Sequence, residues 1–444
     1  MKRFATIFVA IALMAVAMPV GSSARSREKN RAEVISRGKG YYKDVFMDSG
    51  IRLSSRRSLP SIPFLGMELE SFVSASKKNL TAVDTLLQKK IFCGCEEDTN
   101  GRLLYPDGAP RYRMIYVNGG NAAGHGRTLT EEGRKNIVKF VKEGGSYLGS
   151  CAGAYLASAG GYGPKPKPRL TDIYLGLWPA YAHSTMLRKS RTDMLIDKKS
   201  PLWRYYDFGK DCKVAAVSHN GGCYAFHHED KPFPSKGEVL SRYIFEDSGR
   251  VKIDGKPSAW AYKENKYTGR AISCGSHPEG VKSGERLEYM AAMVLYAMEG
   301  NGIPRTKGEL KAGEVREMNK RTEDNNPAFT RIGDKQYHHF EFKVPKKCKK
   351  AILTLEGYEG ENNFDLTLCT KRGELAFEDN ATSKKRSKGC NKQLVISKPK
   401  VGKWYVSVLC ETTVEAMQGK YGTEYSGRTD VLNGVPYKIS VKYE

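Results

Sequence analysis

A cysteine flanked by small residues is the first candidate nucleophile in the sequence. The segment Gly144–Tyr155 has the pattern of a short strand that runs straight into a helix, with Cys151 in the turn between them. Glycine and other small residues flank Cys151, as the sharp turn of a nucleophile elbow requires. Such a turn places the sulfur at a helix N-terminus, where the thiolate is favoured. Since a lone buried cysteine is more often a small core residue, the interpretation depends on partner residues elsewhere.

The partners that a nucleophilic cysteine needs occur far along the chain, in Ser276–Gly280. His277 has the chemistry of a general base, and Glu279 has that of the group which orients it. Residues of one catalytic site are usually distant in sequence and close in the fold. We therefore predict a catalytic triad of Cys151, His277 and Glu279.

These segments resemble those of a known superfamily, the class I glutamine amidotransferase-like domains with their Cys…His-x-Glu triad. Gly144–Ala157 is similar to the corresponding segment of the biotin-protein ligase N-terminal domain family, and Tyr116–Asn121 and His219–Gly222 also fit that family. The resemblance extends over residues 40–300. It implies a flavodoxin-like α/β domain in which the two triad segments meet, and it says little about the substrate.

The same resemblance gives roles to two loops. A glycine-rich loop would supply the backbone N–H groups of Gly119 and Gly120 to an oxyanion hole, with the N–H of Ala152 as the other donor. Ordinary turn chemistry is the alternative for this loop. The turn at His219 and Asn220 would border the active cleft.

Two departures from the superfamily narrow the function. Tyr155 stands where glutaminase members usually carry Gln, and the sequence has no synthetase, ligase or biotin-binding domain. Glutamine amidotransfer and biotin ligation are therefore not expected, and an amide or peptide-like bond is the favoured substrate. The leading hypothesis is a cysteine amidohydrolase or acyl-transfer enzyme. The alternatives are a binding protein that keeps the fold without turnover, and a redox or reactive-carbonyl role for Cys151.

Strands and helices alternate through residues 40–300, which predicts an α/β domain with a mainly parallel sheet. Sites in such sheets lie at the carboxyl ends of the strands, and the position of Cys151 agrees with that rule. The expected strands are 42–47, 113–117, 214–218, 238–245, 258–262 and 270–274. The expected helices are 79–89, 284–300 and a segment that follows the capping-box pattern Thr128-x-x-Glu131.

The hydrophobic period changes to two beyond a polar linker at residues 301–330. Alternating apolar residues, as in 364–368 and 402–408, predict the short antiparallel strands of a β-sandwich over residues 331–444. These two motifs resemble the bacterial pre-peptidase C-terminal domain, which is appended to secreted enzymes. We expect no catalytic constellation in this domain.

The first residues, 1–24, have the features of a secretory signal peptide: a basic start, an apolar run and small residues before the cleavage site. An uncleaved anchor is the alternative, and residues 25–39 are predicted to be a flexible lead-in. Export to the periplasm, cell surface or medium would place the ten cysteines in an oxidising compartment. Two disulfides of unassigned pairing are predicted among the C-terminal cysteines, which are Cys348, Cys369, Cys390 and Cys410.

The formal net charge is +24. The favoured interpretation of this charge is a well-solvated surface. The alternative is that the charge attracts the protein to an anionic cell-surface polymer. Export and the lack of a recognised nucleic-acid-binding fold argue against nucleic acid as a partner. The run His227–Asp230 resembles a metal cluster by composition only, so we expect neither a metal nor a cofactor. The oligomeric state stays open.

Overall fold

The computed structural model describes residues 23–48, 59–72, 102–163, 168, 172–321, 326–360, 363–419 and 422–444. Nearly all of the predicted signal peptide, the predicted helix 79–89, Cys93 and Cys95 lie outside the described residues. Within these ranges no helix has the length and apolar character needed to cross a membrane.

The described helices and strands follow the chain in this order: α1 (Ala24–Ser36), β1 (Lys43–Asp48), α2 (Ser61–Phe64), β2 (Leu69–Phe72), β3 (Tyr112–Val117), α4 (Ala122–Thr128), α5 (Thr130–Lys142), β4 (Ser146–Ser150), α6 (Ala152–Ala157), β5 (Ser158–Tyr162), β6 (Trp178–Ser184), β7 (Ser190–Ile196), β8 (Lys213–His219), β9 (Cys223–Phe226), β10 (Gly237–Ile244), β11 (Pro257–Tyr262), β12 (Ala271–Cys274), α7 (Glu285–Glu299), β13 (Val315–Met318), β14 (Tyr337–Val344), β15 (Lys350–Glu356), β16 (Leu366–Arg372), β17 (Ser383–Lys385), β18 (Lys392–Ser397), β19 (Gly402–Cys410), β20 (Val414–Gly419), β21 (Gly422–Gly427) and β22 (Tyr437–Tyr443).

A nine-stranded sheet in the order β2-β1-β3-β4-β12-β11-β10-β7-β8 organises the first domain. The strands from β2 to β12 pair in parallel, whereas those from β12 to β8 pair antiparallel. The α/β prediction is confirmed, but the sheet is mixed rather than mainly parallel. Within the antiparallel half, β7–β8, β10–β11 and β11–β12 are consecutive in the chain, and such antiparallel neighbours need no crossover helix.

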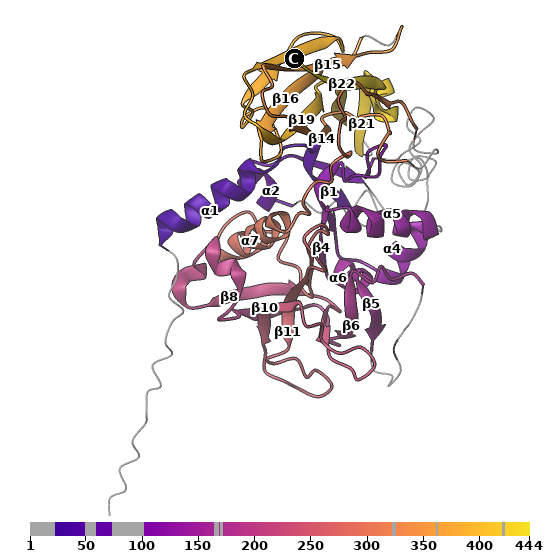
Figure 1. Cartoon of the computed structure of the whole chain (residues 1–444). Coiled ribbons are helices and arrows are strands. Elements are labelled where there is room, and N and C mark those ends of the chain that lie inside the picture. Colours follow the sequence, from indigo (N-terminus) through magenta and orange to yellow (C-terminus); the bar gives the residue numbers. More distant parts are fainter. Residues whose placement is uncertain are drawn as a thin grey trace, which may run out of the picture.

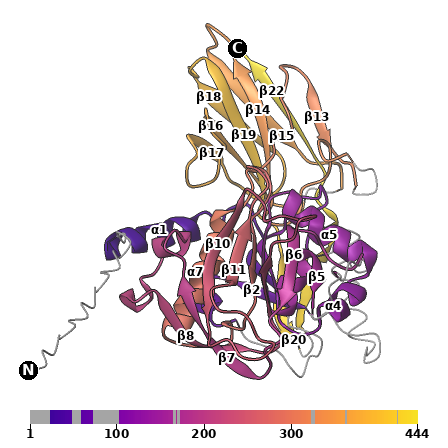
Figure 2. The same ribbon diagram turned by 90° about the horizontal axis from the view of Figure 1, so that it is seen from below.

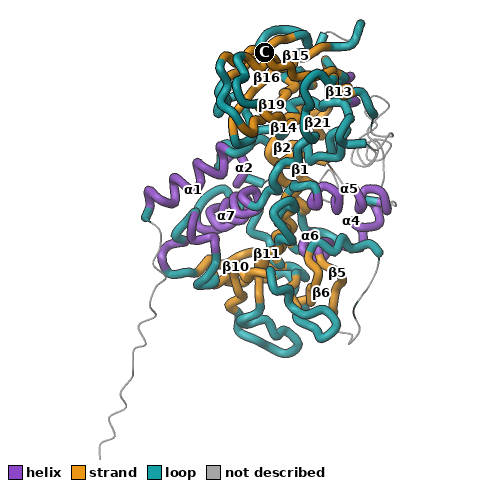
Figure 3. The backbone as a smooth tube through the Cα atoms, viewed as in Figure 1, coloured by secondary structure: helices purple, strands orange, loops and turns teal. Residues whose placement is uncertain are grey.

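Helices cover both faces of the parallel half, as Figures 1 and 3 show. Side chains alternate along each strand, so Ile115 of β3 joins the core under α5, while its neighbour Met114 joins the core under α7. Eleven residues of α7 are buried. This helix therefore forms the centre of one core layer rather than an amphipathic cover. A separate three-stranded sheet, β5-β6-β9, lies beside the large one.

Residues 25–39 were predicted to be a flexible lead-in, yet α1 occupies most of this segment. Three contacts hold α1 against the domain. Arg27 pairs with Asp207 at 2.9 Å, Arg31 donates to the Tyr205 carbonyl at 2.6 Å, and Val34 is buried in the core. These partners are distant in sequence, so the local composition gave no sign of the helix.

The second domain contains two four-stranded antiparallel sheets, β13-β22-β15-β18 and β14-β19-β16-β17. Their apolar faces share one core, which continues into the layer under α5. This is the predicted β-sandwich, whose strands are drawn in Figure 2. The predicted linker 301–330 differs from expectation because it includes β13, which pairs with β22. A further hairpin, β20–β21, leaves the sandwich and reaches the first domain.

Buried polar groups join the two domains. Arg111, just before β3, donates two hydrogen bonds to Asp334, from Nε at 3.1 Å and from Nη2 at 2.7 Å. Arg111 also donates to the hydroxyl of Tyr425 on β21 at 2.8 Å. That hydroxyl in turn donates to Glu70 at the edge of the large sheet, at 2.7 Å. Arg111 and Asp334 are both almost fully buried.

The predicted disulfides are absent from the described residues, in which all eight cysteines are free thiols. Cys348 precedes β15, and Cys390 precedes β18. Because β15 and β18 are antiparallel, with Lys350 opposite Ser397, these two cysteines lie near opposite ends of the pair. Cys369 lies opposite Ser407 in the β16–β19 ladder, and Cys410 lies opposite Leu366. Cys369 and Cys410 are therefore three residue pairs apart along this ladder.

Candidate functional site

Cys151 occupies a strained position between β4 and α6. Its backbone angles are φ 48° and ψ −103°, a region that residues with a side chain rarely adopt and that often marks a functional site. Two glycines make the turn feasible. A Cβ on Gly153 would stand 2.2 Å from the Val117 carbonyl oxygen, and one on Gly149 would stand 2.5 Å from the Gly153 carbonyl carbon. The N–H of Cys151 donates to the Cys274 carbonyl at 2.8 Å, which ties the turn to β12.

The neighbouring strand brings the histidine to the cysteine. β12 lies next to β4 and runs parallel to it, so the segment after Cys274 emerges at the same sheet edge as Cys151. The N–H of His277 donates to the Ser218 carbonyl at 2.8 Å, and its Nδ1 lies 2.8 Å from Glu279 Oε1. Glu279 is 3% exposed. The structure thus brings together the three residues that the sequence analysis selected.

The electrostatics of His277 follow from these contacts. Burial alone would lower its pKa, but side-chain hydrogen bonds with Cys151 and Glu279, and the negative charges of both groups, raise the pKa of His277 to about 10. The imidazole is therefore protonated at neutral pH. An imidazolium between a thiol and a carboxylate stabilises negative charge on the sulfur.

The raised pKa of His277 should make the stability of the folded protein depend on pH. The folded-state pKa of His277 is raised from 6.5 to about 10, so the stabilisation that it contributes is complete below pH 6.5 and is lost as the pH rises through 10. We expect the melting temperature of His277→Gln to fall below that of the wild type at low pH, and the gap to close in alkaline buffer. Differential scanning fluorimetry across this range measures the gap. His227→Gln, at an exposed histidine, is the control, and a gap that widens with pH would contradict the assignment.

The three backbone N–H groups predicted for an oxyanion hole differ in whether they already donate a hydrogen bond within the described part of the chain. The N–H of Gly119 donates to Asn118 Oδ1 at 2.8 Å and is therefore occupied. Among the described residues, the N–H groups of Gly120 and Ala152 have no hydrogen-bond acceptor. Ala152 is the first residue of α6, where N–H groups lack partners within the helix. Gly120 follows β3, the neighbour of β4, so these two N–H groups are the better candidates.

His219 is placed as a structural residue rather than a substrate contact. Its Nε2 lies 2.6 Å from the Thr185 hydroxyl and its Nδ1 lies 2.7 Å from the Ser276 hydroxyl. Burial first, and then the charge of His277, lower the pKa of His219 to about 4, so the imidazole is neutral. Through Ser276, His219 positions the segment that carries His277.

Asn220 approaches the cysteine through its backbone. The Cys151 sulfhydryl donates to the Asn220 carbonyl oxygen at 3.8 Å. The side-chain Oδ1 of Asn220 accepts from the Lys189 N–H at 3.2 Å and is thus used in holding the loop. Asn220 therefore lies beside Cys151, and the chemical group that faces the cysteine is its backbone carbonyl.

Three further residues surround the cysteine, and none of them was predicted to be a site residue. The Tyr155 hydroxyl donates to the Gly222 carbonyl at 3.2 Å and so links α6 to the turn after β8. The sulfhydryl of Cys223 lies 4.0 Å from the Cys151 carbonyl oxygen, and Cys274 accepts the Cys151 N–H. The position of Cys274 three residues before His277 was an available signal, because a residue at the end of the same strand must lie at the same edge.

A metal centre finds no support in the described ranges, in which no three His, Cys, Asp or Glu side chains gather in a group able to hold an ion. In the run His227–Asp230, His228 contacts the carboxylate of Asp230, and Asp230 also accepts from the Tyr181 hydroxyl at 2.7 Å. These contacts account for the run as a surface turn.

Comparison with solved structures gives distant matches. A crystal structure of a glutamine amidotransferase is 18% identical, covers 42% of this chain and 80% of its own, and has a TM-score of 0.27. The pre-peptidase C-terminal domain of a collagenase from Bacillus anthracis is 12% identical, covers 30% of this chain and 90% of its own, and has a TM-score of 0.16. No curated protein sequence matches the chain.

Comparison with family models gives a match that is local and lies at the cysteine. It covers residues 107–161, from the segment before β3 to β5, and therefore includes Cys151, Ala152, Gly119 and Gly120 but neither His277 nor Glu279. The model is described as the N-terminal domain of biotin-protein ligase. In the part that carries β3, β4 and Cys151, this chain is thus similar in sequence to the biotin-protein ligase N-terminal domain.

Proposed function

We propose that this protein is an exported cysteine-dependent hydrolase or acyl-transfer enzyme that acts on an amide or peptide-like bond. The observation that carries the proposal is the convergence of Cys151, His277 and Glu279 at the carboxyl ends of two adjacent parallel strands. A partly buried imidazolium that contacts both a thiol and a carboxylate is the arrangement that activates a cysteine nucleophile. A structural cysteine needs neither partner.

In the first half of the reaction the Cys151 thiolate attacks the carbonyl carbon of the substrate. The carbon–sulfur bond forms, negative charge moves to the carbonyl oxygen, and the N–H groups of Ala152 and Gly120 are the donors that would stabilise it. His277 then gives its proton to the departing amine as the carbon–nitrogen bond breaks. The raised pKa of His277 suits this step, because the group must hold a proton before the amine leaves.

In the second half the acyl group leaves the enzyme. Neutral His277 takes a proton from water, the resulting hydroxide equivalent attacks the thioester, and Cys151 departs as thiolate while His277 is left protonated. If an amine replaces water, the same steps transfer the acyl group. Glu279 holds the Nδ1–H of His277 throughout, which fixes the tautomer and the direction of the other ring nitrogen.

The first test is selective alkylation of Cys151. With iodoacetamide at neutral pH, followed by peptide mass spectrometry, Cys151 should react at least about tenfold faster in the wild type than in His277→Ala, because the variant lacks the cation that stabilises the thiolate. Glu279→Gln should give an intermediate rate, since the ring keeps a hydrogen-bond partner but loses the negative charge that supports its protonation.

Two internal references sharpen the alkylation measurement. Burial raises the pKa of the Cys223 thiol well above its ordinary value and that of Cys274 to about 12, so both should stay unmodified. His227→Ala, at an exposed histidine, should behave as the wild type. If Cys151 reacts at the same rate with and without His277, the catalytic proposal fails and the non-catalytic binding protein becomes the better interpretation.

A further inference from the structure

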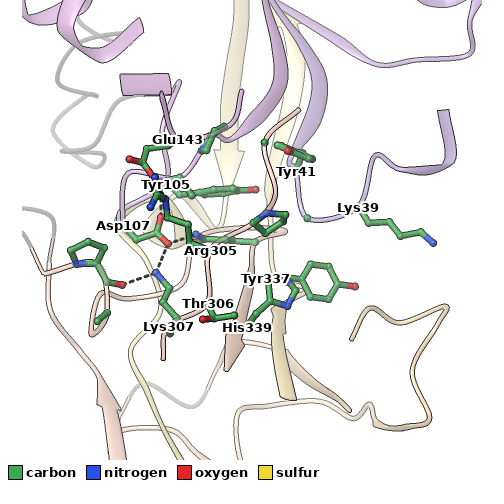
Figure 4. A pocket seen from close by; sticks show the side chains of 18 of the residues that line it. Lys39, Tyr41, Tyr105, Asp107, Glu143, Arg305, Thr306, Lys307, Tyr337 and His339 are labelled. Carbon is green, nitrogen blue, oxygen red and sulfur yellow. Dashed lines mark hydrogen bonds and ion pairs between the residues drawn. The ribbon is translucent and has the colours of Figure 1, made fainter. Parts of the chain in front are cut away.

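A cavity of about 510 Å³ lies at the junction of the two domains, away from the Cys151 site. This volume is within the range of small-molecule sites, roughly 300–1,000 Å³. The lining residues come from the segment before β1, the loop before β3, the end of α5, the chain after α7, residues 327–328, residues 336–339 at the start of β14, and Phe377. Figure 4 shows these residues. No lining residue belongs to the proposed triad.

One wall of the cavity is aromatic. The rings of Tyr337 and His339 on β14 stack with centroids 5.8 Å apart, and Phe377 meets both rings edge-on at 5.1 Å. Burial, followed by the charges of His338 and Lys307, lowers the pKa of His339 to about 3, so its ring is neutral at physiological pH. Tyr41 and Tyr105 of the first domain also line the cavity. Such walls favour a planar ring.

The charges around the cavity compensate one another with one exception. Lys307 pairs with Asp107 at 2.5 Å, and Arg305 pairs with Glu143 at 3.1 Å. Asp107 further accepts from Gln336 at 2.8 Å, so its charge is well satisfied. Lys39 is an ion-pair partner of Asp379.

The exception is Lys139 on α5, which makes no ion pair with a described residue. Its side chain crosses Gly108, where a Cβ would stand 2.7 Å from Nζ. The glycine thus lets the ammonium group lie close to the loop that forms the cavity. One surplus cation beside a ring-lined cavity matches one anionic group on a ring-bearing molecule.

We propose that the cavity at the domain junction binds a small molecule that has a planar ring system and a single anionic group. The rings would lie against Tyr337 and Phe377, and the anionic group would pair with Lys139. Since both domains line the site, binding would add contacts across the junction and stabilise the folded chain in proportion to ligand concentration.

Two probes that share their rings and differ in charge test this proposal on the full mature chain. 8-Anilinonaphthalene-1-sulfonate carries one sulfonate, and N-phenyl-1-naphthylamine is its uncharged counterpart. By fluorescence titration the wild type should bind one equivalent of each, the sulfonate about tenfold more tightly. Lys139→Gln should remove that preference and leave the affinity for the neutral probe unchanged. Ala109→Phe, which places a ring in the cavity, should weaken both.

Lys142→Gln is the matched control, because Lys142 is an exposed lysine on the same helix that does not line the cavity. It should bind both probes as the wild type does. Non-saturable binding, or an unchanged sulfonate preference in Lys139→Gln, would overturn the proposal. Each variant is compared at equal folded fraction, checked by thermal unfolding. Cys151→Ala should leave the affinities for both probes unchanged. The cavity proposal and the catalytic proposal can therefore be disproved independently of each other.

Discussion

Cys151→Ala should lower the rate of amide hydrolysis by about 10⁴-fold, which is the scale of loss when a covalent nucleophile is removed from a triad. The alanine variant keeps the small side chain that the turn between β4 and α6 accepts, so the fold should persist. The measurement is amine release from a panel of peptides and peptide-like amides, with the wild type used first to find a substrate. The effect should appear in kcat rather than in KM, because the lost bond forms only during the reaction.

Cys223→Ala is the matched control for this experiment. Cys223 is also a buried thiol, lies beside Cys151, and has a pKa raised well above its ordinary value by burial. Its loss should leave activity within a few-fold of the wild type. If Cys151→Ala and Cys223→Ala retain equal activity on a substrate that the wild type cleaves, the nucleophile has been assigned wrongly.

Arg111→Met should destabilise the chain by about 3–5 kcal/mol, because it leaves the carboxylate of Asp334 buried without its bidentate partner. The variant also removes the donor to Tyr425 and the guanidinium that lies 3.9 Å from the centre of the Tyr42 ring. Urea unfolding followed by tryptophan fluorescence and far-UV circular dichroism measures the loss. Since the contacts join the two domains, the two signals should separate in the variant if the domains then unfold one after the other.

The double variant Arg111→Met with Asp334→Leu isolates the cause. Replacing both members of a buried pair by apolar residues is often close to neutral, so most of the lost stability should return. Lys135→Met, at the exposed Glu131–Lys135 pair on α5, should change stability by no more than about 0.5 kcal/mol. A loss as large for Lys135 as for Arg111, or no recovery in the double variant, would contradict the argument.

Local sequence pattern was sufficient for the elements that position the cysteine. The strand predicted at 42–47 is β1 at Lys43–Asp48, and the one predicted at 270–274 is β12 at Ala271–Cys274. Both are short runs with several buried apolar residues, and both end where the chain turns at the sheet edge. The segments of Cys151 and His277 could be found because sharp turns restrict which residues can stand beside a reactive group.

Features that depend on distant contacts could not be found in this way. Thr128 was predicted to cap a helix, but its hydroxyl donates to the carbonyls of Gly124 and His125 inside α4, and α5 begins at Thr130. Helix α1 has no apolar stripe and is held by an ion pair and a hydrogen bond to a backbone carbonyl, both with partners far along the chain. Strand β13 is only four residues long, and only Met318 in it is buried, so its pairing with β22 leaves little trace in the sequence.

The contact between Glu70 and Tyr425 has a consequence for biosynthesis. These residues are 355 positions apart, and the Tyr425 hydroxyl is one of the donors to a carboxylate that is almost fully buried at the edge of the large sheet. Domains usually fold in the order in which they are synthesised, but here the edge of the first domain lacks this donor until nearly the whole chain has emerged. The half that carries Cys151 therefore reaches its final packing only after the last segment has been made, and long-range closure of this kind slows folding. A chain truncated before β20 would leave the ribosome with the edge of its first domain incomplete.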